Sequence, residues 1–293
     1  MTSMVYHAGA LGDFITTLPA MAAWRRLHEG ERVVLLGKPA FARLIAPAAP
    51  VFDEVRDAES AFFAPLFSKD TPLAADLVEL FSRVTSALVF ANVSSPLSER
   101  LGACGVRSIM RQDPFPRIPT PIVDYHLSLF PQFSFSEEER VRRVDAAGGA
   151  LRPDGTTVAI HPGSGSSLKN WALARFMELA QSLREDGERV TWIVGPAEAE
   201  MPLPSGARRW SGLHLRDLAG ALSRCRLYVG NDSGVTHLAA ACGCPTIVLF
   251  GVTDQRVWLP RGRMVRAMTS GSTHMDMIAT EAVLRECRMI LAR

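Results

Sequence analysis

The sequence predicts an α/β fold made of two Rossmann-like domains that face one another across a central cleft. Short apolar runs alternate with helical patterns from one end of the chain to the other, which is typical of parallel sheets flanked by helices. The chain has 293 residues, whereas single hydrophobic cores stop growing at about 250–300 residues. The alternation stops in a proline-rich stretch over residues 112–155 and then restarts. We therefore expect one domain at 1–150 and a second at 151–293.

Each half shows its own series of elements. In the first half, apolar and β-branched runs predict strands at residues 4–7, 32–36, 54–56 and 87–90. An apolar repeat over residues 13–27 predicts an amphipathic helix between the first two strands. In the second half, the predicted strands lie at 157–160, 189–194, 227–229 and 246–250, and the predicted helices at 172–185, 215–223, 238–242 and, at the end of the chain, near 280–291.

Composition and charge indicate a soluble globular protein. Hydrophobic residues make up 47% of the chain, charged residues make up 21%, and the formal net charge is +2. A net charge this small argues against a protein that binds nucleic acid through a broad basic surface. The five cysteines show no CxxC or cysteine–histidine zinc spacing, so no metal site is expected. Because no signal peptide and no apolar run of about 20 residues is evident, we expect a cytoplasmic protein.

Gly9, Gly12 and Asp13 follow the first predicted strand, in the segment YHAGALGDF. The two glycines loosen the backbone where a helix begins. Asp13 has two interpretations here: an N-cap, worth about 1 kcal/mol of helix stability, or a carboxylate that accepts a proton from a substrate. The spacing alone favours the cap. The segment does not match GxGxxG, so it is not a dinucleotide fingerprint.

A second glycine- and serine-rich loop follows the strand at 157–160, in the segment HPGSGSSLKNW. Ser164, Gly165 and Ser166 offer backbone amides and hydroxyls, and Lys169 comes just before the next helix. Such a loop can cradle a phosphate, with the lysine as a point charge for a diphosphate. The alternative is a flexible surface loop with a solvated lysine. Since the chain has only three lysines, we favour the phosphate interpretation.

A third loop, GNDSGVTH, joins the strand at 227–229 to a short helix. A helix start leaves unpaired N–H groups, so a helix beginning near Ser233 would offer the amides around Gly234 to an anion. Asp232 would repel a phosphate, and we expect it to cap a backbone N–H or to meet the ligand through a cation. His237 lies one turn further on; it either adds positive charge near the phosphate or simply packs.

Two further loops also follow strands and are weaker candidates. Glu198, in IVGPAEAEM, is placed to accept hydrogen bonds from ribose hydroxyls, or is a solvated glutamate at a helix start. Thr253, in FGVTDQRVWLP, follows the strand at 246–250 and is expected on the ligand-binding side, because ligands bind at the carboxyl ends of parallel strands.

Taken in order, these segments resemble glycosyltransferase family 9, the ADP-heptose:lipopolysaccharide heptosyltransferases. The family pattern G-x-x-G-D-x-x-x-x-x-P matches GALGDFITTLP near the start of the chain. It is followed by HPGSGSSLKNW, by GPAE and by GNDSGVTHLAAACGCPTIVLFGVTD, in the family's order and near its separations. The last segment is long and specific, and the four together extend over nearly the whole chain.

The resemblance implies a GT-B fold and an inverting, metal-independent transfer of a heptose from ADP-heptose to a lipopolysaccharide-core or related glycan acceptor, without a cofactor. It implies that the N-terminal domain binds the acceptor and the C-terminal domain the nucleotide. It gives Asp13 the role of catalytic base, Lys169 that of the diphosphate lysine and Glu198 that of the ribose contact. Its phosphate turn matches Asp232, Ser233, Gly234 and His237.

The chain departs from the family at one place that bears on the acceptor. Many members carry a lysine or arginine a few residues before the G-D pair, where this chain reads Tyr6-His7-Ala8. The departure disfavours an acidic acceptor of the Kdo type, unless an arginine from elsewhere substitutes. A glycolipid or oligosaccharide acceptor is still expected. A lipid-linked acceptor would imply peripheral contact with the inner membrane leaflet, although no amphipathic anchor is evident.

Two other functions remain open from the sequence. Another sugar-nucleotide enzyme of the same fold, such as a 2-epimerase or a hydrolase, would share the nucleotide loops but would need several acid–base groups around the sugar. A non-catalytic nucleotide-sugar-binding protein would bind the donor without turnover. An NAD oxidoreductase is disfavoured, because neither half carries the glycine fingerprint.

Overall fold

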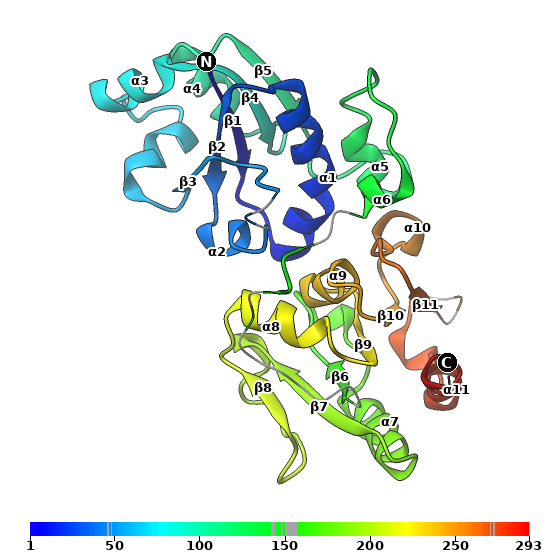
Figure 1. The fold of residues 1–293 in the computed structure, drawn as a ribbon. Helices are drawn as coiled ribbons and strands as arrows, with labels where there is room; N and C mark the ends of the chain where they lie inside the picture. Colours follow the sequence, from blue (N-terminus) through cyan, green and yellow to red (C-terminus); the bar gives the residue numbers. More distant parts are fainter. Residues whose placement is uncertain are drawn as a thin grey trace. The chain divides into compact units, whose positions relative to one another are not determined.

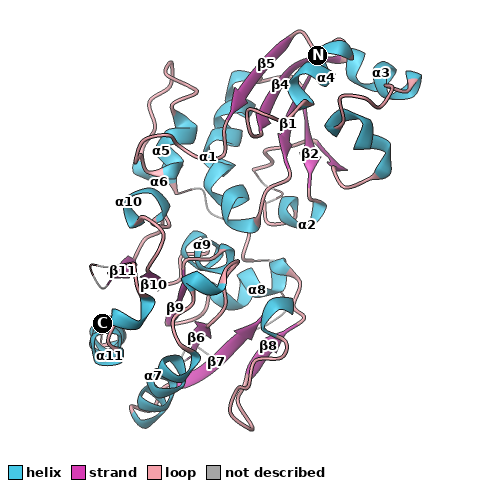
Figure 2. Cartoon of the chain, turned by 180° about the vertical axis from the view of Figure 1, so that it is seen from behind, coloured by secondary structure: helices cyan, strands magenta, loops and turns pink. Residues whose placement is uncertain are grey.

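The computed structural model describes residues 1–45, 47, 49–141, 144–147, 149, 157–269, 271 and 273–292. The chain divides into two compact units, Met1–Arg140 and Val141–Arg293. Figures 1 and 2 show a parallel sheet with flanking helices in each unit. The predicted α/β fold class with two parallel-sheet domains is therefore confirmed. In the structure the division falls after Arg140, whereas the sequence placed the border after residue 150.

The described part of unit 1 forms one five-stranded sheet with the order β3-β2-β1-β4-β5, in which all neighbouring strands are parallel. Its strands are β1 (Thr2–His7), β2 (Arg32–Gly37), β3 (Glu54–Asp57), β4 (Val84–Phe90) and β5 (Ser108–Gln112). Its helices are α1 (Leu11–Leu27), α2 (Pro39–Ala42), the 3-10 helix η1 (Ala61–Phe67), α3 (Ala75–Ser82), α4 (Leu97–Ala103), α5 (Ile122–Leu127) and α6 (Glu137–Arg140).

The middle of this sheet is a continuous apolar layer. Val5 on β1 lies opposite Leu35 on β2 and Leu88 on β4, and all three side chains are fully buried. Strands covered by helices on both faces need apolar side chains on both faces, so they read as unbroken hydrophobic runs instead of alternating ones. This is why β1, β2 and β4 could be recognised in the sequence.

Helix α1 differs from the predicted amphipathic helix, because its first half is buried without interruption from Phe14 to Met21. The two polar side chains in this run, Thr16 and Thr17, turn their hydroxyls onto the helix backbone and donate to the carbonyl of Asp13 at 2.9 and 3.0 Å. Because these hydroxyls are satisfied within the helix, they can be buried at little cost. The prediction of strong amphipathicity was therefore wrong for this half of the helix.

The described part of unit 2 forms one six-stranded parallel sheet with the order β11-β10-β9-β6-β7-β8. Its strands are β6 (Thr157–His161), β7 (Arg189–Val194), β8 (Arg209–Ser211), β9 (Leu227–Asn231), β10 (Thr246–Phe250) and β11 (Val265–Thr269). Its helices are η2 (Ser167–Lys169), α7 (Leu173–Glu185), η3 (Pro196–Glu198), α8 (Leu215–Leu222), α9 (Gly234–Ala241), α10 (Gln255–Trp258), η4 (Met275–Met277) and α11 (Thr280–Leu291). The predicted terminal helix near 280–291 is confirmed.

One face of this sheet carries the main core of unit 2. Ile160 at the centre of the sheet lies opposite Val229 and Trp192, and all three are fully buried. Helices α7 and α11 pack against one another and contribute Phe176 and Cys287 to the same apolar cluster. The helices therefore fix the positions of β6, β7 and β9, whose carboxyl ends carry the loops of interest.

In both sheets the strand order reverses once, and a reversal of this kind is where open α/β sheets bind ligands. In unit 1 the reversal lies between β1 and β4, and in unit 2 it lies between β6 and β9. The loops that follow β1, β6 and β9 are the three glycine-containing loops identified in the sequence. In the described residues, no helix has both the length and the apolar character needed to cross a membrane.

Candidate functional site

Polar side chains gather at the carboxyl ends of β6, β7 and β9, next to the strand reversal of unit 2. Figure 1 shows these three strands in the sheet of unit 2. We call this group the switch-point cluster. Its members are His161, Lys169, Glu198, Asp232, Ser233 and His237. Four of the six side chains are buried, whereas Lys169 and Ser233 are half-buried. A buried polar cluster of this size at a strand reversal is the strongest candidate for a ligand site in unit 2.

Lys169 and Asp232 form an ion pair, in which the Lys169 Nζ donates to Asp232 Oδ2 at 2.9 Å. Asp232 is 5% exposed, and His237 Nε2 lies 3.9 Å from its other carboxylate oxygen. The expectation that Asp232 caps a backbone N–H was therefore wrong, because its partner is a lysine. The alternative of a solvated Lys169 was also wrong. Through this pair the Lys169 ammonium lies at the turn and neutralises the Asp232 carboxylate, which would otherwise repel a phosphate.

Helix α9 begins at Gly234 with Ser233 as its N-cap, at the start that the sequence analysis considered, whereas the helix predicted there covered only residues 238–242. The Ser233 hydroxyl accepts a hydrogen bond from the Thr236 amide at 3.4 Å. This cap leaves the amides of Gly234 and Val235 at the helix start, where the helix dipole favours an anion. The turn between β9 and α9 therefore combines open N–H groups with the nearby Lys169 charge.

Asn231, which the sequence analysis missed, joins two of the loops. It is fully buried at the end of β9, where its Oδ1 accepts a hydrogen bond from the Trp171 amide at 3.0 Å. Its Nδ2 donates to the Pro162 carbonyl at 2.7 Å. Asn231 thereby fixes the loop after β6 relative to the end of β9. An asparagine at the last position of an apolar strand is the sequence signal that could have identified Asn231.

Glu198 is buried, with an exposed fraction of 5%, so the alternative of a solvated glutamate was wrong. Its Oε2 accepts a hydrogen bond from the Gly195 amide at 2.9 Å and lies 3.6 Å from His161 Nε2. The hydrogen bond from His161 is the main cause that lowers the pKa of the Glu198 carboxyl below its usual value. The other oxygen lies against Gly163, where a Cβ would be only 1.8 Å from Glu198 Oε1.

The hydroxyls of Ser164 and Ser166 are directed into their own loop. Ser164 Oγ is 2.7 Å from both the Ser166 carbonyl and Asn170 Oδ1, and Ser166 Oγ accepts from the Leu168 amide. The Ser164 hydroxyl therefore donates within the loop, whereas the Ser166 hydroxyl acts only as an acceptor among the described residues, and the phosphate contact expected of this loop stays a prediction. Gly165, between them, has open space where a Cβ would be.

Thr253 lies after β10, the neighbour of β9 in the sheet. Its hydroxyl is buried and has no hydrogen-bond partner among the described residues. The next residue, Asp254, is the N-cap of α10 and also pairs with Arg256 at 2.7 Å. A buried hydroxyl without a partner among the described residues, after the strand next to β9, is suited to a polar ligand atom, because leaving it unpaired costs free energy.

In unit 1, α1 begins at Leu11, so that Gly12 and Asp13 lie inside its first turn and Asp13 is not the N-cap residue. Asp13 still caps the helix, because its Oδ2 accepts a hydrogen bond from the Ala10 amide at 3.2 Å. Its Oδ1 has no hydrogen bond among the described residues. The structure thus shows a capping role for one oxygen of Asp13, and the role of catalytic base stays a prediction.

Two buried histidines lie near this loop, in an aromatic cluster of unit 1. The rings of His7 and His126 are 5.9 and 5.4 Å from the Phe90 ring, and both Nδ1 atoms are buried without a partner among the described residues. Burial lowers the pKa of His7 from 6.5 to about 4 and that of His126 to about 3. His7 is therefore neutral near pH 7 and supplies no positive charge before the G-D pair.

We expect acid to destabilise unit 1 through these two histidines. Their pKa values are lower in the folded than in the unfolded chain, so their contribution is present above about pH 6.5 and is lost as the pH falls towards 4. A pKa lowered from 6.5 to about 4 corresponds to about 3 kcal/mol for His7. Urea unfolding at several pH values should show this loss, and His126→Phe should reduce it. An equal pH dependence in the variant would contradict the account.

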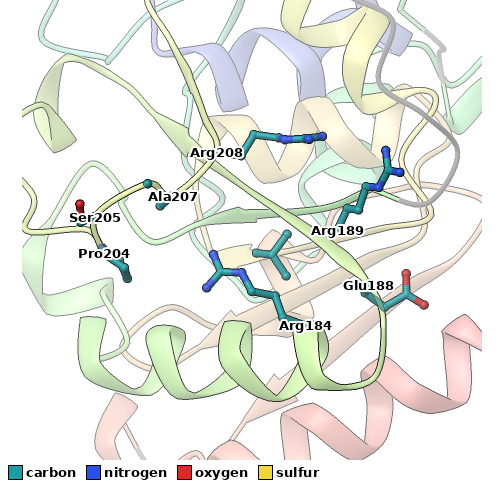
Figure 3. A pocket seen from close by; sticks show the side chains of 9 residues that line it. Arg184, Glu188, Arg189, Pro204, Ser205, Ala207 and Arg208 are labelled. Atoms are coloured by element: carbon teal, nitrogen blue, oxygen red, sulfur yellow. The ribbon is translucent and has the colours of Figure 1, made fainter.

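A pocket elsewhere in unit 2 is separate from the switch-point cluster. It has a volume of about 360 Å³ and is lined by Arg184, Arg189, Arg208 and the 204–207 turn (Figure 3). Arg189 is the first residue of β7, so the pocket lies at the opposite end of that strand from Glu198. It contains no residue predicted to bind the ligand. Among the described residues, no group of three or more His, Cys, Asp or Glu side chains is placed to hold a metal ion.

Known heptosyltransferases are similar to this chain in sequence and in fold. The chain is 28% identical over 115 residues to lipopolysaccharide heptosyltransferase 3 of Escherichia coli strain K12, in a match that covers 35% of this chain and 33% of that protein. The match thus spans about a third of this curated relative. The structure of E. coli ADP-heptose LPS heptosyltransferase II has a TM-score of 0.75 at 17% identity, over 100% of this chain and 99% of that chain.

A second solved structure, E. coli heptosyltransferase WaaC with ADP, has a TM-score of 0.73 at 17% identity and covers 99% of this chain and 100% of that chain. These likenesses confirm the GT-B fold class. The family model of glycosyltransferase family 9 (heptosyltransferase) matches residues 118–286, more than half of the chain. This match shows that the chain belongs to glycosyltransferase family 9.

Proposed function

We propose that this chain is a glycosyltransferase that moves a heptose from ADP-heptose to a lipopolysaccharide-core or related glycan acceptor, with inversion and without a metal ion. The observation that carries the proposal is the Lys169–Asp232 pair beside the start of α9, at the strand reversal of unit 2. Membership of family 9 supports the reaction class. The solved heptosyltransferase with ADP, which shares the fold, supports an adenine nucleotide.

In this proposal, unit 2 binds the donor. The diphosphate lies at the start of α9, where the amides of Gly234 and Val235 and the Lys169 ammonium stabilise its charge. The Lys169 ammonium contacts both Asp232 and the diphosphate. Its positive charge therefore reduces the repulsion between the Asp232 carboxylate and the ligand. Glu198 Oε1 accepts from the ribose, since Oε2 is already bonded to Gly195. Thr253 provides a further hydroxyl.

Asp13 Oδ1 acts as the base in unit 1. It removes the proton from an acceptor hydroxyl, whose oxygen forms a bond to the anomeric carbon. The bond from that carbon to the diphosphate oxygen breaks, and ADP leaves with the electron pair through an oxocarbenium-like transition state. Lys169 and the α9 amides stabilise the charge that develops on the leaving group. Because these donors are fixed by the fold, the charge can be stabilised without a divalent ion.

The test of the proposed function is a transfer assay with ADP-heptose and a panel of core oligosaccharides as acceptors. We expect a new glycoside with inverted anomeric configuration, formed at an undiminished rate in EDTA. An epimerised sugar from donor alone would contradict the transferase in favour of a 2-epimerase. Binding of the donor without turnover on any acceptor would favour a non-catalytic binding protein. Loss in EDTA that magnesium restores would contradict the metal-independent mechanism.

A further inference from the structure

Three arginines surround the pocket of unit 2 that lies at the amino end of β7 (Figure 3). Arg184, Arg189 and Arg208 line this pocket together with the turn over residues 204–207. We call it the arginine pocket. Its volume of about 360 Å³ lies within the range of about 300–1,000 Å³ that is typical of small-molecule sites. The proposed transfer reaction uses none of its residues.

The turn between α7 and β7 places the first two arginines at the same end of the sheet. Arg184 lies in the last turn of α7, and Arg189 is the first residue of β7. Within the turn, Gly187 has a φ of +90°, and the Glu188 amide donates to the Leu183 carbonyl at 2.9 Å. The turn is therefore closed by its own hydrogen bond, and the positions of both arginines follow from the fold.

The third arginine is placed by the pairing of β7 with β8. Arg208 directly precedes β8, and its carbonyl accepts a hydrogen bond from the Trp192 amide at 2.9 Å. Successive side chains of an extended chain point to opposite faces. Arg208 accordingly lines the pocket, whereas Arg209 does not line it and donates to the Leu203 carbonyl at 3.4 Å.

Positive charge exceeds negative charge around the arginine pocket. Glu188, the carboxylate among the described lining residues, is already paired with Arg226 at 2.6 Å. Neither Arg184 nor Arg208 forms an ion pair with another residue in the part of the chain that the structure describes. Like charges that line one cavity repel one another, and an anion between them would replace this repulsion with attraction.

The turn that closes the pocket adds uncharged donors. The Ala207 amide donates to the Pro204 carbonyl at 3.1 Å, whereas the amides of Ser205 and Gly206 form no hydrogen bond with another described residue. Backbone amides and hydroxyls beside guanidinium groups are donors that bind phosphate oxygens and neighbouring hydroxyl groups. The buried Val190 gives the pocket an apolar part. The lining therefore suits a small anion that also carries a polar organic group.

We propose that the arginine pocket binds the phosphate group of a phosphorylated small polyol, either as a soluble phosphate ester or as the headgroup of an anionic phospholipid. A guanidinium offers two parallel N–H groups that match two phosphate oxygens. A phosphate monoester carries about −1.5 to −2 charges near pH 7, so it can pair with both Arg184 and Arg208. The polyol lies against the turn, where the Ser205 hydroxyl and the open amides bond its hydroxyl groups.

Calorimetry with the full-length chain tests this site. The soluble probes are glycerol 3-phosphate and inorganic phosphate, and the lipid probe is vesicles of phosphatidylcholine with phosphatidylglycerol. We expect Arg184→Gln/Arg208→Gln to weaken binding about tenfold or more. The matched pair Arg43→Gln/Arg107→Gln, which removes two exposed arginines of unit 1, should leave it unchanged.

The probes also distinguish the two sources of the phosphate. Arginine-dependent binding of glycerol 3-phosphate supports a soluble ester, and arginine-dependent binding of the vesicles alone supports a lipid headgroup. No binding of any probe, or equal affinities in the two double variants, would overturn the proposal.

The same titrations in Lys169→Gln separate this pocket from the proposed donor site, which is a second place for a phosphate. We expect the arginine-dependent binding to persist, because Lys169 lies at the carboxyl end of the sheet, beside Asp232. Binding that is lost in Lys169→Gln but kept in Arg184→Gln/Arg208→Gln would place the phosphate at the start of α9 and overturn the second site. Since the arginine pocket takes no part in the proposed transfer, a failure of the transfer assay would leave this result unaffected.

Discussion

Replacing Asp13 with asparagine should lower the rate of sugar transfer by roughly 10²- to 10⁴-fold, the range for losing a general base. Asparagine retains an oxygen that can accept the hydrogen bond from the Ala10 amide, so the helix cap is kept while the proton acceptor is lost. The affinity for ADP should stay within a few-fold of wild type, because the proposed nucleotide contacts all lie in unit 2. Single-turnover transfer assays and calorimetry with ADP measure the two effects separately.

A matched control for this change is Asp76→Asn. Asp76 also lies in the first turn of a helix of unit 1, α3, and bonds a backbone amide, that of Leu77 at 2.8 Å. We expect no change in transfer for this variant. A turnover of Asp13→Asn within a few-fold of wild type would show that Asp13 is a cap alone, and the proposed mechanism would lose its base.

Replacing Gly163 with alanine should displace the Glu198 carboxylate, because the new Cβ would lie 1.8 Å from Oε1 and 2.3 Å from the carboxyl carbon. Glu198 would then leave the Gly195 amide and His161 unsatisfied in a buried site. The free energy of unfolding should fall by about 1–3 kcal/mol, the cost of an unsatisfied buried polar group. Affinity for ADP should also fall if Glu198 binds the ribose. Urea unfolding and calorimetry measure these quantities.

Two further variants separate this clash from a general effect on the loop. Gly165→Ala adds a methyl group to the same loop where nothing lies within 4 Å, and its unfolding free energy should stay within about 0.5 kcal/mol of wild type. In a Glu198→Ala background, Gly163→Ala should cost much less than in the wild type, because the clashing side chain is absent. Additive effects of the two substitutions would contradict the close approach seen in the structure.

The sequence predicts most of the fold because the buried parallel strands are continuous apolar runs ended by glycine-containing loops. Val5, Ile160 and Val229 lie on the central strands of the two sheets, and each belongs to an unbroken apolar run that is visible in the sequence. Helix α1 was read wrongly because its buried threonines are polar in sequence but satisfied within the helix. The sequence shows that a threonine is polar, but it does not show which atom the threonine hydroxyl donates to.

The sequence identified most residues of the switch-point cluster one by one, but it did not show which of their side chains contact one another. Lys169 and Asp232 are 63 positions apart, and no local pattern shows that one compensates the other. The Ser164 hydroxyl donates to the Ser166 carbonyl two residues on, and no sequence pattern distinguishes this contact within the loop from a contact with a ligand. His161 and Asn231 were missed because each ends an apolar strand and looks like a core residue.

The central claim is that unit 2 binds a nucleoside diphosphate at the start of α9, and calorimetry tests it most directly. ADP, UDP, GDP and CMP should be titrated into the wild type and into Lys169→Gln, with Lys69→Gln, an exposed lysine of unit 1, as the charge-matched control. We predict that ADP binds best and that Lys169→Gln alone weakens it by about 1.5–3 kcal/mol. No binding of any nucleotide, or equal affinities in the two lysine variants, would contradict the account.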